Sequence, residues 1–326
     1  MSPGAIAPGL LSAITIALAG SFLAREHGGP QLLYALFFGI AFNFAAASPQ
    51  IRPGIDFASK KVLRIGVALL GARITFGQIA ELGAGTLAIV VVAVVATIAF
   101  GVLLARLMGR PMAQGLLGGG AVAICGASAA LALAAVLPKN ETQHRFTLLA
   151  VVGVTTLSTI AMVAYPLLAG VLGLSPEATA IFLGGSIHDV AQVVGAGFTV
   201  SPRVGEGATL VKLMRVAMLV PVVLAVTWLF RNTPGSEDGA RPPLLPGFLI
   251  GFVALVVLNS LGYVPAAVGA ALAGASRWCL VIAIAALGVR TSFADLARLG
   301  WQPVAMLIAE TVFIGALVLA GTAFLH

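Results

Sequence analysis

The chain has 326 residues, of which 60% are hydrophobic and only 9% are charged, and its mean hydropathy is +1.09. A soluble domain carries roughly a quarter charged residues, so this composition excludes a water-exposed surface and indicates a protein embedded in lipid. The net charge of +7 comes from Lys and Arg scattered at the ends of apolar runs, without the basic stripe of a nucleic-acid-binding protein. The only two cysteines, Cys125 and Cys279, are too few for a disulfide framework and form no metal-binding pair, so neither a metal nor another cofactor is expected.

The hydropathy pattern predicts an all-α polytopic membrane protein with about 9–11 hydrophobic segments, because a bilayer core needs roughly 20 apolar residues per helix. In chain order the clean spans are 5–24, 31–48, 62–80, 84–107, 146–171, 207–230, 244–261, 277–294 and 302–325. The first is interpreted as a span rather than a signal peptide, since no basic residue precedes it. Two more stretches, 112–137 and 177–199, are rich in glycine and are predicted to be broken or re-entrant helices. A polar connection at 231–243 is the candidate seam between two halves of a single transmembrane domain, 1–326.

An internal repeat relates residues 67–83 to residues 284–300. Eight of these seventeen positions are identical, including Gly71 with Gly288, Arg73 with Arg290, and Phe76 with Phe293. A weaker match relates the glycine-rich stretches at 117–128 and 183–192. Transporters often contain inverted repeats, so we expect segment 62–107 to be related to segment 277–325 by an axis in the membrane plane.

The distribution of basic residues indicates the orientation. With both glycine-rich stretches as hairpins, the positive-inside rule places the N-terminus in the cytoplasm and the C-terminus outside the inner membrane. The inner side then holds twelve basic residues and the outer side four: Arg52, Lys60, Lys61, Arg64, Arg106, Arg110, Lys139, Arg145, Arg231, Arg241, Arg290 and Arg298 against Arg25, Arg73, Arg203 and Arg277. If both stretches cross the membrane fully, Lys139 and Arg145 change sides and the ratio is ten against six.

The stretch 115–130 contains five glycines at membrane depth. Non-helical backbone at this depth is tolerated where it lines protein or a wet cavity, and the positive N-terminal ends of broken helices bind anions. Close helix packing through small residues is the alternative interpretation. The candidate substrate-binding residues here are Gly119, Gly120, Cys125, Gly126 and Ser128.

The stretch 183–197 places ionisable residues inside an apolar segment. His188 and Asp189 are costly there and are therefore candidates for proton or ion coupling. Ser186 and Gln192 are candidates for substrate binding, and Gln192 shares a helical face with His188. A purely structural polar network is the alternative interpretation.

Lys212 and Arg215 lie three residues apart, on one face of a helix. They are candidates for binding an anionic substrate or for neutralising Asp189, and the alternative is that they extend toward the lipid interface. Glu310 and Asn43 also lie inside spans, and each is interpreted as structural.

Three motifs give the chain a resemblance to the YeiH-like sulfate-exporter family of bacterial inner-membrane proteins: ICGASAA at 124–130, GGSIHDVAQVVGAG at 184–197 and VKLMRV at 211–216. The resemblance covers essentially the whole chain, although Asp189 and Ala130 stand where Glu or Ile is expected. That family is similar to the sodium/proton antiporters and bile-acid symporters, which implies inverted repeats with two broken helices crossing near the midplane. The implied substrate is a sulfur oxyanion or an organic sulfonate.

The leading hypothesis is a secondary transporter that exports a small anion, namely sulfate, sulfite or an organic sulfonate, coupled to protons or sodium. The alternatives are a cation/proton antiporter that uses Asp189 and His188, and a channel. The sequence contains no GxSxG, HExxH or Walker A motif, so we expect neither an intramembrane enzyme nor an ATP-driven pump. The expected partners are the small anion, a coupling proton or sodium ion and the lipid bilayer, with a homodimer left open and no nucleic acid.

Overall fold

A computed structural model describes residues 3–27, 30–81, 83–138, 140–230, 247–291 and 301–325. Within these ranges the chain forms helices and turns and no strand, which confirms the all-α prediction. Six helices are long and apolar enough to cross a membrane: Gly4–His27, Gly83–Leu107, Glu141–Val171, Pro202–Phe230, Ala266–Arg290 and Trp301–Phe324. Three shorter apolar helices are Gln31–Ala41, Val190–Val200 and Gly247–Ser260. The polar connection 231–243 lies outside the described residues, as do Phe293 and the rest of the second repeat copy beyond Thr291.

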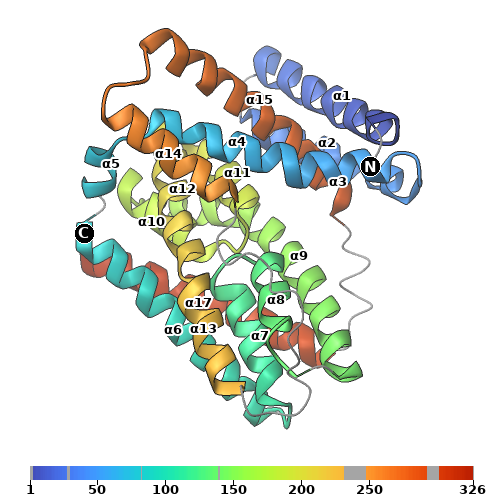
Figure 1. Cartoon of the computed structure of the whole chain (residues 1–326), viewed down its shortest axis with the longest axis vertical. Coiled ribbons are helices and arrows are strands. Elements are labelled where there is room, and N and C mark those ends of the chain that lie inside the picture. Colours follow the sequence, from blue (N-terminus) through green and yellow to red (C-terminus); the bar gives the residue numbers. More distant parts are fainter. Residues whose placement is uncertain are drawn as a thin grey trace. The chain divides into compact units, whose positions relative to one another are not determined.

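The chain forms two compact units. The first consists of Met1–Glu81, Val194–Glu206 and Pro246–Ser292. In it α15 packs against α1, α2 and α4, and α14 packs against α4 (Figure 1, blue and orange ribbons). Its elements are α1 (Pro3–His27), α2 (Gln31–Ala41), η1 (Asn43–Ala47), α3 (Arg52–Phe57), η2 (Ala58–Val62), α4 (Leu63–Leu70), η3 (Gly71–Arg73), α5 (Phe76–Glu81), α14 (Gly247–Ser260) and α15 (Ala266–Arg290), with parts of α11 and α12.

The second unit consists of Leu82–Val193, Gly207–Leu245 and Phe293–His326. In it α7 packs between α6 and α9, and α17 contacts α6, α7, α9 and α10. Its elements are α6 (Gly83–Leu107), α7 (Met112–Ala123), α8 (Ala127–Ala134), α9 (Glu141–Val171), α10 (Pro176–Ser186), α11 (Val190–Val200), α12 (Pro202–Ala217), α13 (Leu219–Phe230) and α17 (Trp301–Leu325), with the last part of α11 and the first part of α12 assigned to the first unit.

Local sequence signals explain where the helices of the second unit begin. The Asn140 side chain accepts a hydrogen bond from the Gln143 N–H at the start of α9 (2.8 Å). At the start of α10, Ser175 accepts from the Ala178 N–H (3.2 Å), and Pro176 occupies the first helical position. Both are side-chain caps that satisfy N–H groups with no partner inside the helix.

The predicted boundaries of the span 62–80 are wrong. The helix begins at Arg52, passes through one π-helical segment at Ala58–Val62 and ends at Leu70, before the short helix η3. Lys60, Lys61 and Arg64 therefore lie in the helix, on its exposed side, rather than in a loop. Hydropathy misplaced this span because long basic side chains extend from a helix toward polar surroundings without ending it.

Matching contacts surround the two copies of the repeat. Asn43, after α2, donates from Nδ2 to the Val289 carbonyl near the end of α15 (2.8 Å). Asn259, in α14, donates in the same way to the Ile74 carbonyl just after α4 (3.1 Å). A Cβ on Gly71 would overlap the carbonyl oxygen of a residue in α14, and a Cβ on Gly288 would overlap one in α2. Each helix that carries a repeat copy thus closely approaches the short apolar helix from the other half of the chain.

The repeat arginines are also matched. Arg73 forms an ion pair with Glu206 (2.7 Å), and Arg290 forms one with Asp56 (3.0 Å). Arg290 also donates to the Ser59 hydroxyl (3.0 Å). In each copy the glycine allows close helix packing, and the arginine two positions further along the sequence forms an ion pair.

Replacing Gly288 by Ala should lower the stability of the protein by about 1–3 kcal/mol, the usual cost of an extra methyl group in a closely packed interface. The added Cβ would overlap the Leu36 carbonyl oxygen and lie 2.8 Å from the Gly39 Cα. Gly274→Ala, on the same helix, is the matched control, because its Cβ meets no described atom within 4 Å. Thermal unfolding of the purified variants in detergent measures the difference, and equal melting temperatures would contradict the packing role.

Candidate functional site

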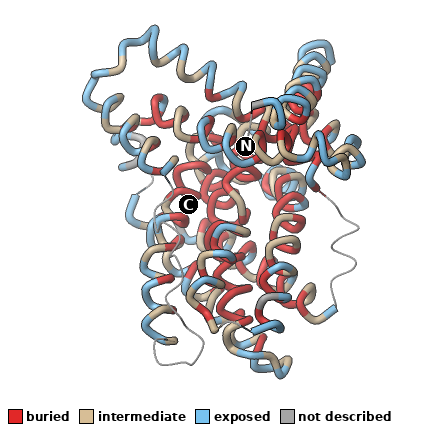
Figure 2. The backbone as a smooth tube through the Cα atoms, turned by 45° about the vertical axis from the view of Figure 1, so that its right-hand side comes forward, coloured by how far each residue is buried: buried red, intermediate tan, exposed pale blue. Residues whose placement is uncertain are grey.

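Both glycine-rich stretches are interrupted helices, as predicted. Between α7 and α8 the chain turns at Ile124–Gly126, where Gly126 has a φ of +62°. Between α10 and α11 it turns at Ile187–Asp189. All residues of 114–126 and 178–188 are buried (Figure 2, red). We call the two interruptions, residues 124–126 and 187–189, the paired breaks.

The paired breaks lie against each other within the second unit. A Cβ built on Gly126 would stand 3.8 Å from the Cβ of His188 and 3.9 Å from that of Asp189. These distances are those of ordinary van der Waals contact, so the two breaks are direct neighbours. The structure therefore brings together four of the predicted site residues from separate parts of the sequence, Cys125, Gly126, His188 and Asp189.

Arg215 is fully buried on α12 and hydrogen-bonds both broken helices. Its guanidinium donates to the carbonyls of Ala123 (2.8 Å) and Val122 (2.8 Å), at the end of α7. It also donates to Gly184 (3.1 Å) and Ile187 (2.9 Å), at the end of α10. These bonds use four of the five N–H hydrogens of a guanidinium.

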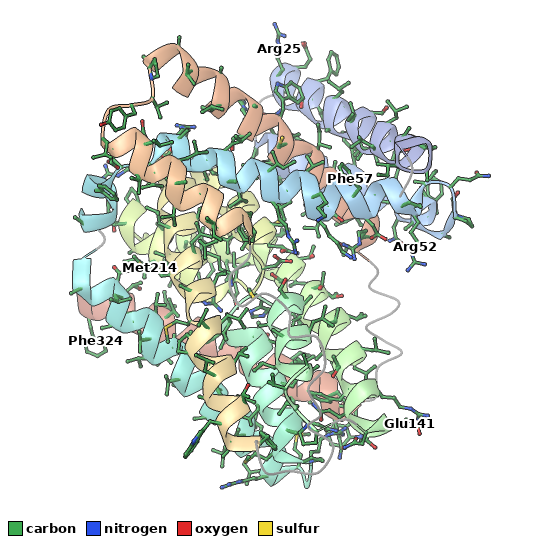
Figure 3. The ribbon with its side chains drawn as sticks, in the orientation of Figure 1. Arg25, Arg52, Phe57, Glu141, Met214 and Phe324 are labelled. Atoms are coloured by element: carbon green, nitrogen blue, oxygen red, sulfur yellow. The ribbon has the colours of Figure 1, made fainter. Side chains whose placement is uncertain are left out.

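Lys212, one turn earlier on α12, is also fully buried. Its ammonium donates to the Ile124 carbonyl (2.5 Å) in one break and to the Ile187 carbonyl (2.9 Å) in the other. Two of its three hydrogens are thus occupied. Figure 3 labels Met214, which lies between these two cations in the sequence of α12.

The positions of the two cations have a direct electrostatic reason. The last carbonyls of a helix have no partner inside it and carry the negative end of the helix dipole. Lys212 and Arg215 contact such carbonyls at the end of α7 and at the end of α10. Their positive charges therefore neutralise the negative dipole ends of both helices. The N-terminal ends of α8 and α11 begin at the same paired breaks, and their first N–H groups also have no partner inside their helices.

His188 is oriented by α17. Its Nε2 lies 2.9 Å from the Thr311 hydroxyl oxygen, and that hydroxyl donates its only hydrogen to the Leu307 carbonyl (2.6 Å). Nε2 must therefore be the donor toward Thr311. Nδ1 is buried and has no hydrogen-bond partner among the described residues. The neutral imidazole thus has its N–H fixed at Nε2 and a lone pair at Nδ1 that can accept a proton.

The remaining polar residues of this stretch contact the neighbouring helix α9 or their own helix. The Asp189 backbone N–H donates to the Ser158 hydroxyl (3.1 Å), and Gln192 Nε2 lies 3.5 Å from the Thr159 hydroxyl. Gln192 Oε1 has no partner among the described residues. The Ser186 hydroxyl donates to the Phe182 carbonyl in its own helix (2.5 Å).

The other predicted glycine-stretch residues have different surroundings. A Cβ on Gly119 would meet α6 backbone at 2.9 Å, so Gly119 allows α7 to approach α6 closely. A Cβ on Gly120 would overlap the Leu133 side chain of α8. Ser128 is exposed in the first turn of α8, while Cys125 is buried and free. Packing thus explains Gly119 and Gly120, which lie inside α7 rather than in the paired breaks.

Sequence reasoning did not find Thr311, Ser158 or Thr159, because single hydroxyls in apolar helices are common and each acts here on a residue far away in the chain. It also did not find that the partners of the two cations are backbone carbonyls. The sequence did carry one signal for the site as a whole. Two glycine-rich stretches and a pair of cations, Lys212 and Arg215, follow one another in the same part of the chain.

The first unit contains a separate cavity of about 930 Å³. Three of the four arginines that were predicted on the outer side of the membrane line this cavity, namely Arg25, Arg73 and Arg277 (Arg25 is labelled in Figure 3). Arg277 donates to the Gln31 side chain (2.9 Å). The cavity wall therefore carries several positive charges together with apolar side chains.

Long apolar helices, two interrupted helices and a buried cation pair define a multi-pass α-helical membrane protein. Residues 8–307 match the family described as Conserved hypothetical protein 698. The chain belongs to this family, the UPF0324 membrane proteins.

Three relatives show how far the similarity extends. The chain is 51% identical to UPF0324 membrane protein RB0971 of Rhizobium meliloti, over 98% of this chain and 93% of the relative. It is 51% identical to UPF0324 membrane protein CT0845 of Chlorobaculum tepidum, over 98% and 89%. It is 50% identical to UPF0324 membrane protein TauZ of Paracoccus pantotrophus, over 96% and 94%. These names give a membrane location, and none of them describes a sulfate exporter.

Proposed function

We propose that this protein is a secondary transporter of the bacterial inner membrane that exports a small anion, of the class sulfate, sulfite or organic sulfonate. The observation that carries the proposal is the contact of Lys212 and Arg215 with both broken helices. Two buried positive charges and the N-terminal ends of α8 and α11 share one region, and an anion is the ligand that this charge distribution favours. The sulfate-exporter assignment is part of the proposal and rests on the motifs at 124–130, 184–197 and 211–216.

The roles within the site follow from the hydrogen-bond count. Each cation has one N–H hydrogen left after its contacts with backbone carbonyls. We assign these hydrogens and the first N–H groups of α8 and α11 to the substrate oxygens. His188 and Asp189 are assigned to the coupling proton or sodium ion, because both lie at the break beside Gly126.

The architecture that we propose is a pair of inverted repeats whose broken helices cross near the midplane, with the N-terminus in the cytoplasm. The matching contacts of Asn43 and Asn259, and those of the repeat glycines, support this relation. Inverted repeats place the substrate site where their discontinuous helices meet. The arginine-lined cavity of the first unit would lie on the outer side and attract anions there.

A binding screen and a transport assay test this function together. Sulfate, sulfite, methanesulfonate and a dicarboxylate are added to purified protein at equal ionic strength, with chloride as the control. A bound anion at a hundredfold excess over Kd stabilises the folded state by about 2.7 kcal/mol, so the melting temperature should rise with one anion class. The same anion should then show counterflow in proteoliposomes.

The rival functions give different results in these assays. A cation/proton antiporter that uses Asp189 and His188 would respond to sodium and pH, and no anion would stabilise it. A channel would show conductance without saturable counterflow. Absence of both anion stabilisation and anion counterflow in the wild-type protein would refute the proposed function.

A further inference from the structure

Glu310 is a completely buried acidic residue on α17. Neither of its carboxyl oxygens has a hydrogen-bond partner within the part of the chain that the structure describes. Buried polar groups are nearly always paired, and a buried ionised carboxylate without a partner is very unfavourable. The sequence alone gave no reason to separate this residue from ordinary structural acids.

Glycines from two neighbouring helices surround the Glu310 carboxyl group. A Cβ on Gly118 of α7 would stand 3.1 Å from both carboxyl oxygens, and a Cβ on Gly101 of α6 would stand 2.6 Å from Oε1. The carboxyl group therefore fills space that any other residue at either position would occupy. The hydroxyl of Thr97, one turn before Gly101, is also buried without a partner among the described residues.

This environment suits a proton better than a metal ion. The described residues contain no cluster of three or more His, Cys, Asp or Glu side chains that could hold a metal. Among the described residues, no ion pair or hydrogen bond brings a cation or an N–H donor to Glu310. A protonated carboxyl group, in contrast, carries its own donor and needs no cation beside it.

Glu310 is also linked to the paired breaks through its neighbour in the chain. Thr311 contacts His188 Nε2 at 2.9 Å, while Glu310 contacts Gly118 in the first half of the other broken helix. Two successive residues of α17 therefore contact the two broken helices. A change in the charge of Glu310 would act on α7 directly, and on His188 through the next residue of α17, Thr311.

We propose that Glu310 is a proton-binding site that couples proton movement to transport. The inference rests on the proposed function, and it adds a coupling group outside the paired breaks. The step is the binding of one proton by the carboxylate to give the carboxylic acid, followed by its release on the other side of the membrane. The neutral acid fits the closed packing of α6, α7 and α17, and the carboxylate requires those helices to separate enough to admit water.

Of the helices packed against α17, three carry other ionisable groups among the described residues, namely α6, α9 and α10. Arg106 lies in the last turn of α6, and the described residues of α7 include no charged side chain. On α9, Tyr165 has its hydroxyl oxygen 3.5 Å from the Thr311 carbonyl, and Glu141 and Arg145 pair with each other at the exposed start of that helix. On α10, Glu177 lies in the first turn, and His188 follows the helix.

The test compares Glu310→Gln with wild type in proteoliposomes. Anion counterflow without a pH gradient measures exchange, and anion accumulation driven by a pH gradient measures coupling. Glu310→Gln keeps the shape of the side chain but cannot release a proton, so it should keep counterflow and lose accumulation. Glu141→Gln, which removes an exposed carboxylate, is the matched control and should keep both.

A second measurement needs no variant. A hydrophobic carbodiimide reacts with a protonated carboxyl group in an apolar environment, so wild-type protein should be modified at Glu310, as seen by peptide mass, and less so as the pH rises. The inference would be overturned if Glu310→Gln still accumulated the anion. It would also be overturned if the folded variant lost counterflow and accumulation together. If that variant does not fold, modification that is absent or independent of pH would overturn it. Wild-type counterflow failing altogether would instead refute the proposed function.

Discussion

Arg215→Ala is expected to abolish transport and to cause the largest loss of stability of any single substitution in the second unit. The change removes the hydrogen bonds that Arg215 donates to the carbonyls of Val122, Ala123 and Gly184. Each buried carbonyl left without a partner costs about 1–3 kcal/mol, so a total above about 3 kcal/mol is a large share of the usual 5–15 kcal/mol of a folded domain. Fluorescence-detected size exclusion and thermal unfolding in detergent measure the effect.

Two further variants separate charge from geometry. Arg215→Lys keeps the charge but offers three donors on a single nitrogen, which cannot reproduce four bonds to two helix ends. It should therefore recover only part of the stability. Arg106→Ala removes an exposed arginine from α6 and should leave the melting temperature unchanged. A wild-type melting temperature for Arg215→Ala would show that the helix ends are held by something other than this guanidinium.

Hydropathy and glycine content predicted most of the helices of this protein. The spans 84–107 and 302–325 correspond to α6 and α17 almost residue by residue, because lipid-facing helices must be continuously apolar. The interruptions at Ile124–Gly126 and Ile187–Asp189 fall inside the two stretches where glycines cluster. The spans 62–80 and 277–294 were misplaced substantially, since their helices begin at Arg52 and Ala266, because the basic residues inside these helices resemble those of a loop.

The contacts of the site were less predictable, for a physical reason. Lys212 and Arg215 were recognised as cations on one helical face, but a backbone carbonyl has no signature in the sequence that would identify it as their partner. The same holds for Thr311 and His188, which are 123 residues apart and meet only through helix packing. Glu310 could be recognised only from the glycines around it, and Gly101 and Gly118 belong to two other helices.

Gly126→Ala should weaken both folding and anion binding, because this glycine permits the turn between α7 and α8. Its φ of +62° and ψ of −127° form a backbone conformation that residues with a Cβ rarely adopt. Space is not the obstacle, since an added Cβ would lie in ordinary contact with Val154 (3.7 Å), His188 (3.8 Å) and Asp189 (3.9 Å). Strain of this kind costs about 1–3 kcal/mol.

The functional effect of Gly126→Ala should exceed its effect on stability, because relief of the strain would turn the N-terminal end of α8 away from the paired breaks. Counterflow of the stabilising anion should therefore fall even at temperatures where the variant stays folded. Gly170→Ala is the matched control, since Gly170 is exposed on α9 and its added Cβ would meet no described atom within 4 Å. That helical substitution should be neutral or stabilising by up to about 1 kcal/mol. If Gly126→Ala kept wild-type counterflow and melting temperature, the turn at Gly126 would not be what positions α8, and the anion would have to be bound elsewhere.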